Sequence, residues 1–438
     1  MIACYRLLFF LLFLVGLPAH VVKMWRRGAL FDTWWDRLGL YRNIPPRHAH
    51  KKRVWLQVVS VGEAHAAMPL LQSLCDHDDC QLFVTTSTST AKAVLTKQFL
   101  DNSSVWIGYF PYDLFWFSQQ AWRRIQPDWA LLMESELWPE HLYQARCRSV
   151  PIWLINARHS MKTVARYKCY PWLATWLYSS LDRVYFTTRD QLDAICSIVP
   201  DVKRFSVMGQ LKLDVMISRL SVHQRHDYHQ SMGFRSITPN TVFLMAASTW
   251  PGEEAVVLDV VQALRDRAID ARAVLVPRHA ERRADLSKLV SQYDLSYSVR
   301  SHGMNSAQDC VVHIADTTGE MQQLCQCVDI ALVGKSFDPH RGGQTPIELA
   351  ACGVSMVYGP QMTNFREVCL DLESHGLVRP ADTTQRAISQ LIWWAEHAED
   401  RLINRQQLLQ WYENNRGGLA VLLRALADVG VSAPHAIG

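Results

Sequence analysis

The sequence predicts an α/β protein of two doubly wound domains, with a hydrophobic N-terminal helix that anchors it to a membrane. The chain has 438 residues, which is long for one domain and enough for two of about 200 each. Hydrophobic residues make up 49% and charged residues 20%, as is typical of globular proteins. In both halves, apolar runs of strand length alternate with amphipathic stretches of helical length. This alternation predicts parallel sheets that helices cover on both faces.

Seven apolar runs in the first half predict a Rossmann-like domain over residues 31–215. The runs lie at 54–60, 82–86, 105–110, 129–134, 151–156, 184–188 and 205–209. The polar, histidine-rich segment 216–240 has no strand pattern, and we interpret it as a linker that is helical in part.

The alternation of strands and helices restarts in the second half of the chain. Apolar runs lie at 242–248, 273–277, 310–315, 330–334 and 355–359. They predict a second Rossmann-like domain over 241–390, followed by C-terminal helices over 391–438. Two such domains facing each other across a cleft form the GT-B architecture, which many nucleotide-sugar transferases and some epimerases share.

The N-terminal helix is predicted from an apolar run at residues 7–22, which is shorter than the roughly 20 residues of a spanning helix. Only Arg6 precedes the run, whereas many basic residues follow it: Lys23, Arg26, Arg27, Arg37, Arg42, Arg47, Lys51, Lys52 and Arg53. Three tryptophans suit the headgroup level: Trp25, Trp34 and Trp35. Positive charge behind the run predicts a cytoplasmic protein seated on anionic lipids, with residues 1–30 as anchor and flank. The run could span the bilayer or dip into it, and a cleaved signal peptide is the alternative.

Several classes of function are disfavoured by the composition and the missing motifs. No glycine-rich dinucleotide fingerprint follows the first strand and no P-loop occurs, which argues against an oxidoreductase or a P-loop ATPase. The net charge of +4 gives no indication of nucleic-acid binding. Eleven cysteines without regular spacing indicate reduced thiols. Cys75 and Cys80 bracket His77 and Asp78, which suggests either a metal site or, as we favour, a polar loop. We expect no metal and no cofactor.

Because ligands bind at the carboxyl ends of parallel strands, motifs that follow strands are the candidate site residues. In the first half, Ser60-Val-Gly-Glu63 offers a carboxylate, although Ser-x-x-Glu is also a helix capping box. Glu134 and Glu136 follow another strand, where they could equally be acidic residues that favour a helix start. Arg158 follows a third strand and could bind an anionic acceptor or lie in a surface loop.

In the second half, the motifs point to an anion such as a nucleotide phosphate. Pro251 suits the first position of a helix, whose free amides attract anions. Arg278 follows a strand and could bind a phosphate or be solvated. Gly342 and Gly343 lead into a helix predicted to have Thr345 as N-cap and Pro346 at its first position, which would make an anion-binding turn. Glu348 could hold a ribose hydroxyl or complete a second capping box.

Eight motifs occur in an order that resembles the 3-deoxy-D-manno-octulosonic acid (Kdo) transferases of lipopolysaccharide synthesis, over nearly the whole chain. They are Ser60-Val-Gly-Glu63, Glu134-Ser-Glu-Leu-Trp-Pro139, Asn156-Ala-Arg-His-Ser160, Gly209-Gln-Leu-Lys-Leu-Asp214, Ala247-Ser-Thr-Trp-Pro-Gly-Glu-Glu254, Val276-Pro-Arg-His279, Asp316-Thr-Thr-Gly-Glu320 and Gly359-Pro-Gln-Met-Thr-Asn-Phe365. The resemblance implies an inverting GT-B enzyme on the cytoplasmic face of the inner membrane. It also implies CMP-Kdo as donor and a lipid A precursor, similar to lipid IVA, as acceptor.

The resemblance also implies roles for individual residues. Glu63 matches the general base, which as a positioned carboxylate contributes ~10²–10⁴-fold to the rate, and Glu134 and Glu136 match a second acidic motif. The acceptor would contact Gly62, Arg158 and Lys212. The donor would contact Ser248, Thr249, Arg278, His279, Gly334, Lys335, Gly342, Gly343, Gln344, Glu348 and Asn364.

The chain departs from the family pattern on the donor side. The family usually has Val-Gly-Gly-Ser where this chain has Lys335 for the second glycine, and Gly-Gly-His-Asn-Pro where it has Gln344 and Thr345. Lys335 could contact the donor's phosphate or carboxylate and partly replace the missing histidine. These departures keep open a transferase that uses another CMP- or UDP-sugar. A catalytically silent membrane scaffold and a nucleotide-sugar epimerase are further alternatives.

Overall fold

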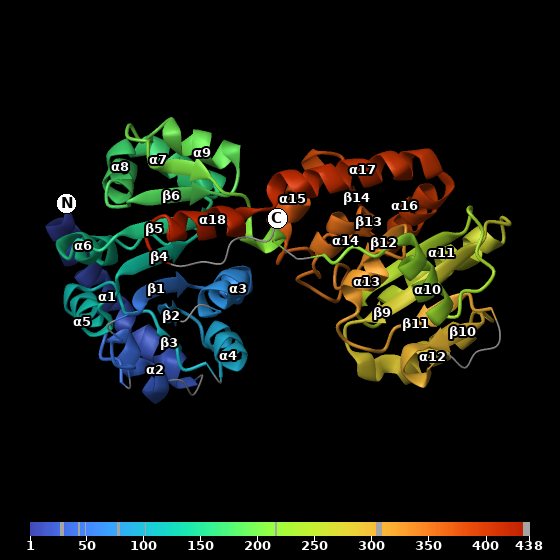
Figure 1. Cartoon of the computed structure of the whole chain (residues 1–438), viewed down its shortest axis with the longest axis horizontal. Helices are drawn as coiled ribbons and strands as arrows, with labels where there is room; N and C mark the ends of the chain where they lie inside the picture. The colour runs from blue at the N-terminus through green and yellow to red at the C-terminus, as the bar shows by residue number, and fades with distance from the viewer. Residues whose placement is uncertain are drawn as a thin grey trace. The chain divides into compact units, whose positions relative to one another are not determined.

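The computed structural model describes residues 1–26, 30–42, 44–48, 50–76, 79–100, 102–214, 217–303 and 309–431; of residues 19–26 and 30–33 it describes the backbone alone. The chain divides into two compact units (Figure 1). Unit 1 comprises Met1–Asp214 and Asn415–Gly438, and unit 2 comprises Val215–Asn414. The predicted segment 391–438 is therefore divided between the two units. Each unit is a parallel α/β domain, as the sequence predicts.

Unit 1 is built on a seven-stranded parallel sheet with the order β3-β2-β1-β4-β5-β6-β7. The strands are β1 (Lys52–Val58), β2 (Cys80–Thr86), β3 (Val105–Tyr109), β4 (Trp129–Met133), β5 (Ile152–Ala157), β6 (Arg183–Phe186) and β7 (Phe205–Val207). Each coincides with one of the seven predicted runs. The order reverses between β1 and β4, and this switch point is where ligands bind in sheets of this kind.

Helices cover both faces of this sheet, because successive side chains of a strand point to opposite faces. On β1, Val54 and Leu56 lie in a core with α3 and α18, whereas Trp55 lies in a second core with α5 and α6. The helices are α3 (Val61–Cys75), α4 (Ser89–Gln98), α5 (Phe115–Ile125), α6 (Pro139–Cys147), α7 (Met161–Cys169), α8 (Pro171–Tyr178), α9 (Arg189–Cys196), the 3₁₀ turn η1 (Leu211–Leu213) and α18 (Gly418–Ala427).

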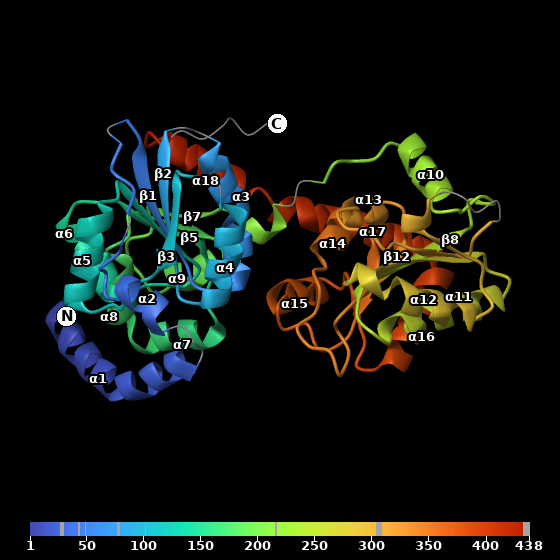
Figure 2. The same ribbon diagram turned by 90° about the horizontal axis from the view of Figure 1, so that it is seen from below.

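The N-terminal helix α1 (Ile2–Arg26) lies against unit 1 and is followed by α2 (Leu30–Arg37) (Figure 2). Arg6 forms a two-point ion pair with the buried Glu140, at 2.7 and 3.0 Å. The Tyr5 hydroxyl donates to Asp113 at 2.7 Å. Within the described residues, no helix has the length and hydropathy needed to cross a bilayer.

The predicted basic flank of this helix is only partly available to a membrane. Arg53 is buried, with 2% of its surface exposed, because its guanidinium donates to Gln81 and to the Ile125 carbonyl. Arg47 pairs with Asp128 at 2.6 Å. The side chains of Lys23, Trp25 and Arg26, and all of Arg27, lie outside the described residues.

Unit 2 is a second seven-stranded parallel sheet, with the order β10-β11-β9-β8-β12-β13-β14. Its strands are β8 (Val242–Thr249), β9 (Ala271–Pro277), β10 (Tyr297–Val299), β11 (Val312–Ile314), β12 (Ile330–Val333), β13 (Ser355–Tyr358) and β14 (Arg379–Pro380). The sequence pattern predicts five of these and misses the edge strands β10 and β14.

The helices of unit 2 follow the same layered plan. They are α10 (Val222–Ser231), α11 (Glu253–Arg265), η2 (Ala280–Arg282), α12 (Arg283–Ser291), η3 (Arg300–His302), α13 (Met321–Cys325), α14 (Ile347–Cys352), α15 (Arg366–Ser374), α16 (Thr384–Glu396) and α17 (Ala398–Asn415). α11 and α16 pack in the core against β8, β9 and β12. This arrangement brings the loops after β8, β9 and β12 to one edge of the sheet.

Candidate functional site

Ionisable side chains of unit 1 gather at the carboxyl ends of β1, β4 and β5, beside the switch point. Glu63 lies in the first turn of α3, which follows β1. Its backbone N–H donates to the Ser60 hydroxyl at 3.2 Å, as in a capping box. Its carboxylate accepts the Val59 amide at 2.8 Å and the Ser60 hydroxyl at 3.1 Å. These bonds fix the rotamer and leave further lone pairs free to accept a proton.

The Glu63 carboxyl is poised to change its charge near neutral pH. Only 7% of the residue is exposed, and this burial, together with the negative charges of Glu134 and Glu136, raises its pKa to about 7. Burial also raises the pKa of Glu136, whose carboxylate accepts the Trp138 indole N–H at 2.7 Å. The Glu63 carboxylate, with a pKa of about 7, is suited to general-base catalysis.

Two cations belong to the same cluster. Arg158, after β5, donates to the Glu134 carboxylate at 2.7 Å. Lys212, in η1, has a lowered pKa because it is buried and because Arg158 is near, while Glu134 and Glu63 oppose this shift. A Cβ atom added at Gly62 would lie 3.7 Å from the Lys212 ammonium, so the two residues are neighbours. The structure thus brings together all six residues predicted for this side of the site: Gly62, Glu63, Glu134, Glu136, Arg158 and Lys212.

The sequence pattern does not predict three features that hold these residues in position. Glu134 and Asn156 adopt left-handed backbone, with φ of 58° and 52°, which costs energy for residues other than glycine. The Asn156 side chain accepts the Leu211 amide at 3.2 Å and so holds η1 in place. Asp214, just after η1, accepts the amides of Gly417 and Leu419 at 2.5 and 2.6 Å and fixes the start of α18.

In unit 2, a buried carboxylate joins the loops after β8 and β12. Glu253, with 3% exposure, accepts the amides of Trp250, Lys335 and Ser336 at 2.9, 2.7 and 3.0 Å. A side chain at Gly334 would come within 2.4 Å of the Ser248 carbonyl oxygen, so only glycine permits this approach. An acidic residue in the first turn of a helix suggests only a dipole effect, so the pattern gives no signal for this role.

The predicted anion-binding turn at Gly342 and Gly343 is wrong. The amides of Gly342, Gly343 and Gln344 each donate, at 3.0 Å, to carbonyls of Gln361, Lys335 and Gly334 respectively, so none is free for an anion. This loop packs against its neighbours through those bonds.

Two predicted helix starts are also wrong. α14 begins at Ile347 with Pro346 as its cap, and Thr345 instead accepts the Ile347 amide at 3.2 Å and donates to Glu348 at 3.0 Å. α11 begins at Glu253 after Gly252, so Pro251 is not its first residue.

The other residues predicted to bind the sugar donor differ in their exposure to solvent. Thr249 is buried and its hydroxyl donates to the Val276 carbonyl at 3.5 Å, whereas Ser248 is half-buried. Arg278 is exposed, and it is Arg282 that pairs with the buried Glu254, at 2.6 Å.

Around Trp250 the structure gathers a set of basic side chains. The Lys335 ammonium lies 4.8 Å from the centre of the indole ring, which is a cation–π contact. The rings of His279 and His340 each pack 5.3 Å from it. Lys335 itself has left-handed backbone, with φ of 59°.

Glu348 and Asn364 lie beside the glycine turn. Burial raises the pKa of Glu348. The Asn364 side-chain amide would come within 2.7 Å of a side chain added at Gly342.

No group of three or more histidine, cysteine, aspartate or glutamate side chains that could hold a metal ion occurs among the residues described. His77 and Asp78, the two residues that suggest a metal site between Cys75 and Cys80, lie outside them. The expectation of a metal-free enzyme stays a prediction.

Comparison with known proteins shows what this chain is similar to. Residues 32–215 match the family model described as "3-Deoxy-D-manno-octulosonic-acid transferase (kdotransferase)". A protein of Bordetella pertussis named 3-deoxy-D-manno-octulosonic acid transferase is 29% identical over 94% of this chain and 96% of its own. One of the same name from Haemophilus influenzae is 28% identical over 89% and 90%. The solved C-terminal CMP-Kdo binding domain of WaaA from Acinetobacter baumannii is 22% identical, covers 43% of this chain and 97% of its own, and has a TM-score of 0.38, too low to support an inference. By these matches the chain is similar to the 3-deoxy-D-manno-octulosonic-acid transferases, the family that its ordered motifs resemble.

Proposed function

We propose that this protein transfers Kdo from CMP-Kdo to a lipid A precursor and that Glu63 is the general base. The observation that carries the proposal is the buried Glu63 carboxylate, with a pKa of about 7, at the carboxyl end of β1. An acceptor hydroxyl would give its proton to Glu63 as its oxygen attacks the anomeric carbon. The bond from that carbon to the CMP phosphate oxygen breaks, and the configuration inverts.

Unit 1 would bind the acceptor through its two cations. A lipid A precursor carries phosphates, and Arg158 and Lys212 stand next to the proposed base. Glu134 would hold Arg158 in place through their 2.7 Å ion pair. Because the pKa of Lys212 is lowered, an anionic acceptor would bind most strongly when this ammonium is protonated.

Unit 2 would bind the donor through side chains, since the amides of its glycine turn are occupied. Arg278 and Lys335 are proposed to contact the phosphate, and Glu348 a ribose hydroxyl. Ser248, Gly334, Gly342 and Asn364 shape the same edge of the sheet. We propose that the two domains work together as in the GT-B architecture.

The protein is proposed to sit on the cytoplasmic face of the inner membrane, with α1 lying in the bilayer interface. One side of α1 is tied to unit 1 by Tyr5 and Arg6, whereas Leu7, Leu8 and Leu12 are each about 60% exposed. Side chains of α7 and α8 provide further exposed apolar and basic groups: Met161, Lys162, Arg166, Lys168, Tyr170 and Trp172. Apolar, aromatic and basic side chains together suit an anionic lipid surface.

The function is tested by incubating the protein with a tetraacylated lipid A precursor and freshly generated CMP-Kdo, followed by mass spectrometry. We expect a mass gain of one or more Kdo units, and a ~10²–10⁴-fold slower gain with Glu63→Gln. Glu399→Gln, at an exposed position of α17, is the matched control and should behave as the wild type. Wild-type turnover by Glu63→Gln would disprove the role of Glu63.

A second candidate function is transfer of another CMP- or UDP-activated sugar to a membrane acceptor. Lys335 and Gln344, where the family usually has glycine and histidine, favour it because both lie on the donor side. If the folded protein adds no Kdo, a screen of activated sugars with the same acceptor distinguishes the two functions.

A further inference from the structure

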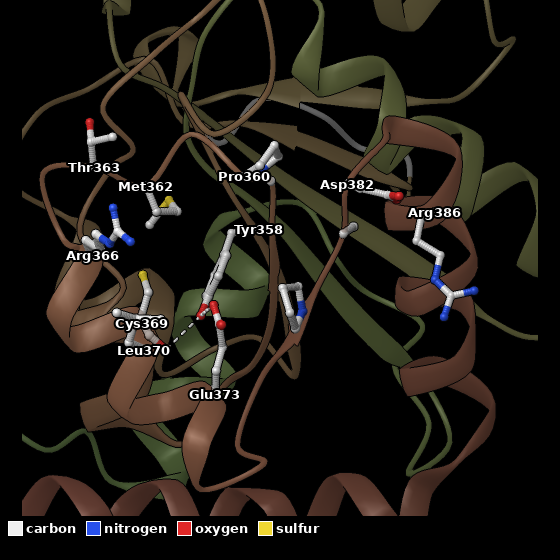
Figure 3. A pocket seen from close by; sticks show the side chains of 13 residues that line it. Tyr358, Pro360, Met362, Thr363, Arg366, Cys369, Leu370, Glu373, Asp382 and Arg386 are labelled. Atoms are coloured by element: carbon white, nitrogen blue, oxygen red, sulfur yellow. Dashed lines mark hydrogen bonds between the residues drawn. The ribbon is translucent and has the colours of Figure 1, made fainter.

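A pocket of unit 2 lies at the carboxyl ends of β13 and β14, between α15 and the start of α16 (Figure 3). Its volume is about 780 Å³, enough for a sugar and part of a nucleotide. One wall is the loop that carries Gly359, Pro360, Met362 and Thr363. The same loop is bonded to the glycine turn, because the Asn364 amide donates to the Gly342 carbonyl at 2.9 Å. The pocket therefore adjoins the residues proposed to bind the donor.

Two arginines line this pocket on opposite sides (Figure 3). Arg366 is on the side of the donor loop, near Met362 and Thr363, and Arg386 is on the far side, near Asp382. Both are exposed, and neither guanidinium has an ion pair within the described part of the chain. By contrast, Arg272, Arg282 and Arg300 of the same unit are each paired with a carboxylate. An unpaired guanidinium beside a binding loop is well placed to take a carboxylate by two hydrogen bonds.

The rest of the pocket suits a polyhydroxylated ring. Glu373 also lines the pocket, and its carboxylate accepts the Tyr358 hydroxyl at 3.0 Å, with lone pairs left for further donors. Thr363 adds an exposed hydroxyl. Met362, Ala381 and Pro360 supply apolar surface against which a ring can pack.

We infer that this pocket binds the acidic sugar of the donor and that Arg366 recognises the sugar's carboxylate. The inference rests on the proposed function, since it takes the donor to be a nucleotide-linked keto-acid sugar. It names Arg366 as a specificity-determining residue. With the carboxylate bound there, the phosphate is left to Lys335 and Arg278.

The test is titration calorimetry of the full-length protein with two ligands, CMP and freshly generated CMP-Kdo. Arg366→Gln should weaken CMP-Kdo binding about tenfold or more, the typical loss of a charged hydrogen bond, and change CMP binding less than twofold. Arg366→Lys should recover part of the loss. Lys288→Gln, at an exposed position of α12 outside this pocket, is the matched control and should bind both ligands as the wild type does.

Equal losses for CMP and CMP-Kdo would overturn the inference, because Arg366 would then act on the nucleotide. Unchanged CMP-Kdo binding by Arg366→Gln would overturn it as well. CMP-N-acetylneuraminic acid, which carries the same carboxylate on its anomeric carbon, separates this inference from the proposed function. If the wild type binds that ligand through Arg366 and does not bind CMP-Kdo, the inference about Arg366 is kept and the proposed transfer of Kdo is rejected. If the wild type binds neither sugar nucleotide but binds CMP, both fail.

Discussion

Two glutamates occupy corresponding places after the two sheets' strands but differ in their hydrogen-bond partners. Glu63 follows β1 and Glu253 follows β8, each in the first turn of the next helix. Glu253 accepts three backbone amides, two of them from a loop more than 80 residues away in sequence. Glu63 accepts one amide and one hydroxyl, and the negative charges of Glu134 and Glu136 act on it. The Glu253 carboxylate stabilises the fold, whereas the Glu63 carboxylate is left free to exchange a proton.

The same difference extends to the surroundings of each glutamate. In unit 1, one oxygen of Glu134 is buried without a partner, and the pKa values of Glu63 and Lys212 move toward neutrality. In unit 2, the amides of the glycine turn and the buried Glu254 have protein partners. The shifted pKa values of Glu63 and Lys212 mark the place where chemistry is expected, since perturbed pKa values cluster at functional sites.

The strongest test of the difference between Glu63 and Glu253 is to replace each of them with alanine. Glu253→Ala would leave three backbone amides of the β8 and β12 loops without a partner, and each buried unpaired donor costs about 1–3 kcal/mol. We expect the free energy of opening in unit 2 to fall by about 3 kcal/mol or more, measured by hydrogen exchange at the β8 and β12 amides. Glu63→Ala should lower the corresponding value for β1 and β4 by less than half as much. Equal losses at the two positions would contradict the distinction between the two carboxylates.

The pH dependence of stability tests the same contrast with a smaller effect. The pKa of Glu63 rises from an ordinary 4.5 to about 7 on folding. Below pH 4.5 the group is protonated in both states, and as pH rises from 4.5 through 7 the folded state alone keeps the proton, so stability is progressively lost. Glu63→Gln, which stays neutral, should therefore be more stable than the wild type above pH 7, by up to about 3 kcal/mol. Hydrogen exchange at β1 and β4 at pH 5 and pH 8 measures this difference.

A gap between Glu63→Gln and wild type that stays constant from pH 5 to pH 8 would show that the carboxyl keeps its ordinary pKa. Glu399→Gln serves again as the control at an exposed position.

The sequence predicts this fold well wherever a strand is long and buried on both faces. All seven strands of unit 1 overlap the predicted apolar runs. The edge strands β10 and β14 have three and two residues, too few to show a pattern. The cluster of Glu63, Glu134, Arg158 and Lys212 is also predictable, because each residue follows a strand or belongs to an ordered motif.

What the sequence cannot predict is which polar groups already have partners. The amides of Gly342 and Gly343 look free in a glycine-rich loop, but their acceptors, Gln361 and Lys335, are set by how separate loops pack. Likewise, Asp113 meets Tyr5 across more than 100 residues. Such pairings depend on tertiary structure, and local spacing contains no information about them.

The smallest expected effect concerns Lys335, where the family usually has glycine. Its left-handed φ of 59° explains that glycine, since a side chain there costs roughly 1–2 kcal/mol. Lys335→Ala keeps the strain and loses the contact with Trp250, whereas Lys335→Gly loses the contact but relieves the strain. We expect Lys335→Gly to be about 1 kcal/mol more stable than Lys335→Ala by hydrogen exchange at β12, after the greater freedom of glycine in the unfolded chain is included.

Both variants of Lys335 remove the same positive charge, so calorimetry should show the same weakening of CMP binding for each. That result would assign the binding effect to the ammonium and the stability effect to the backbone. If Lys335→Gly and Lys335→Ala were equally stable, the left-handed conformation would impose no cost. If both bound CMP as the wild type does, Lys335 would have no part in holding the phosphate, and Arg278 would be left as the exposed cation proposed for that contact.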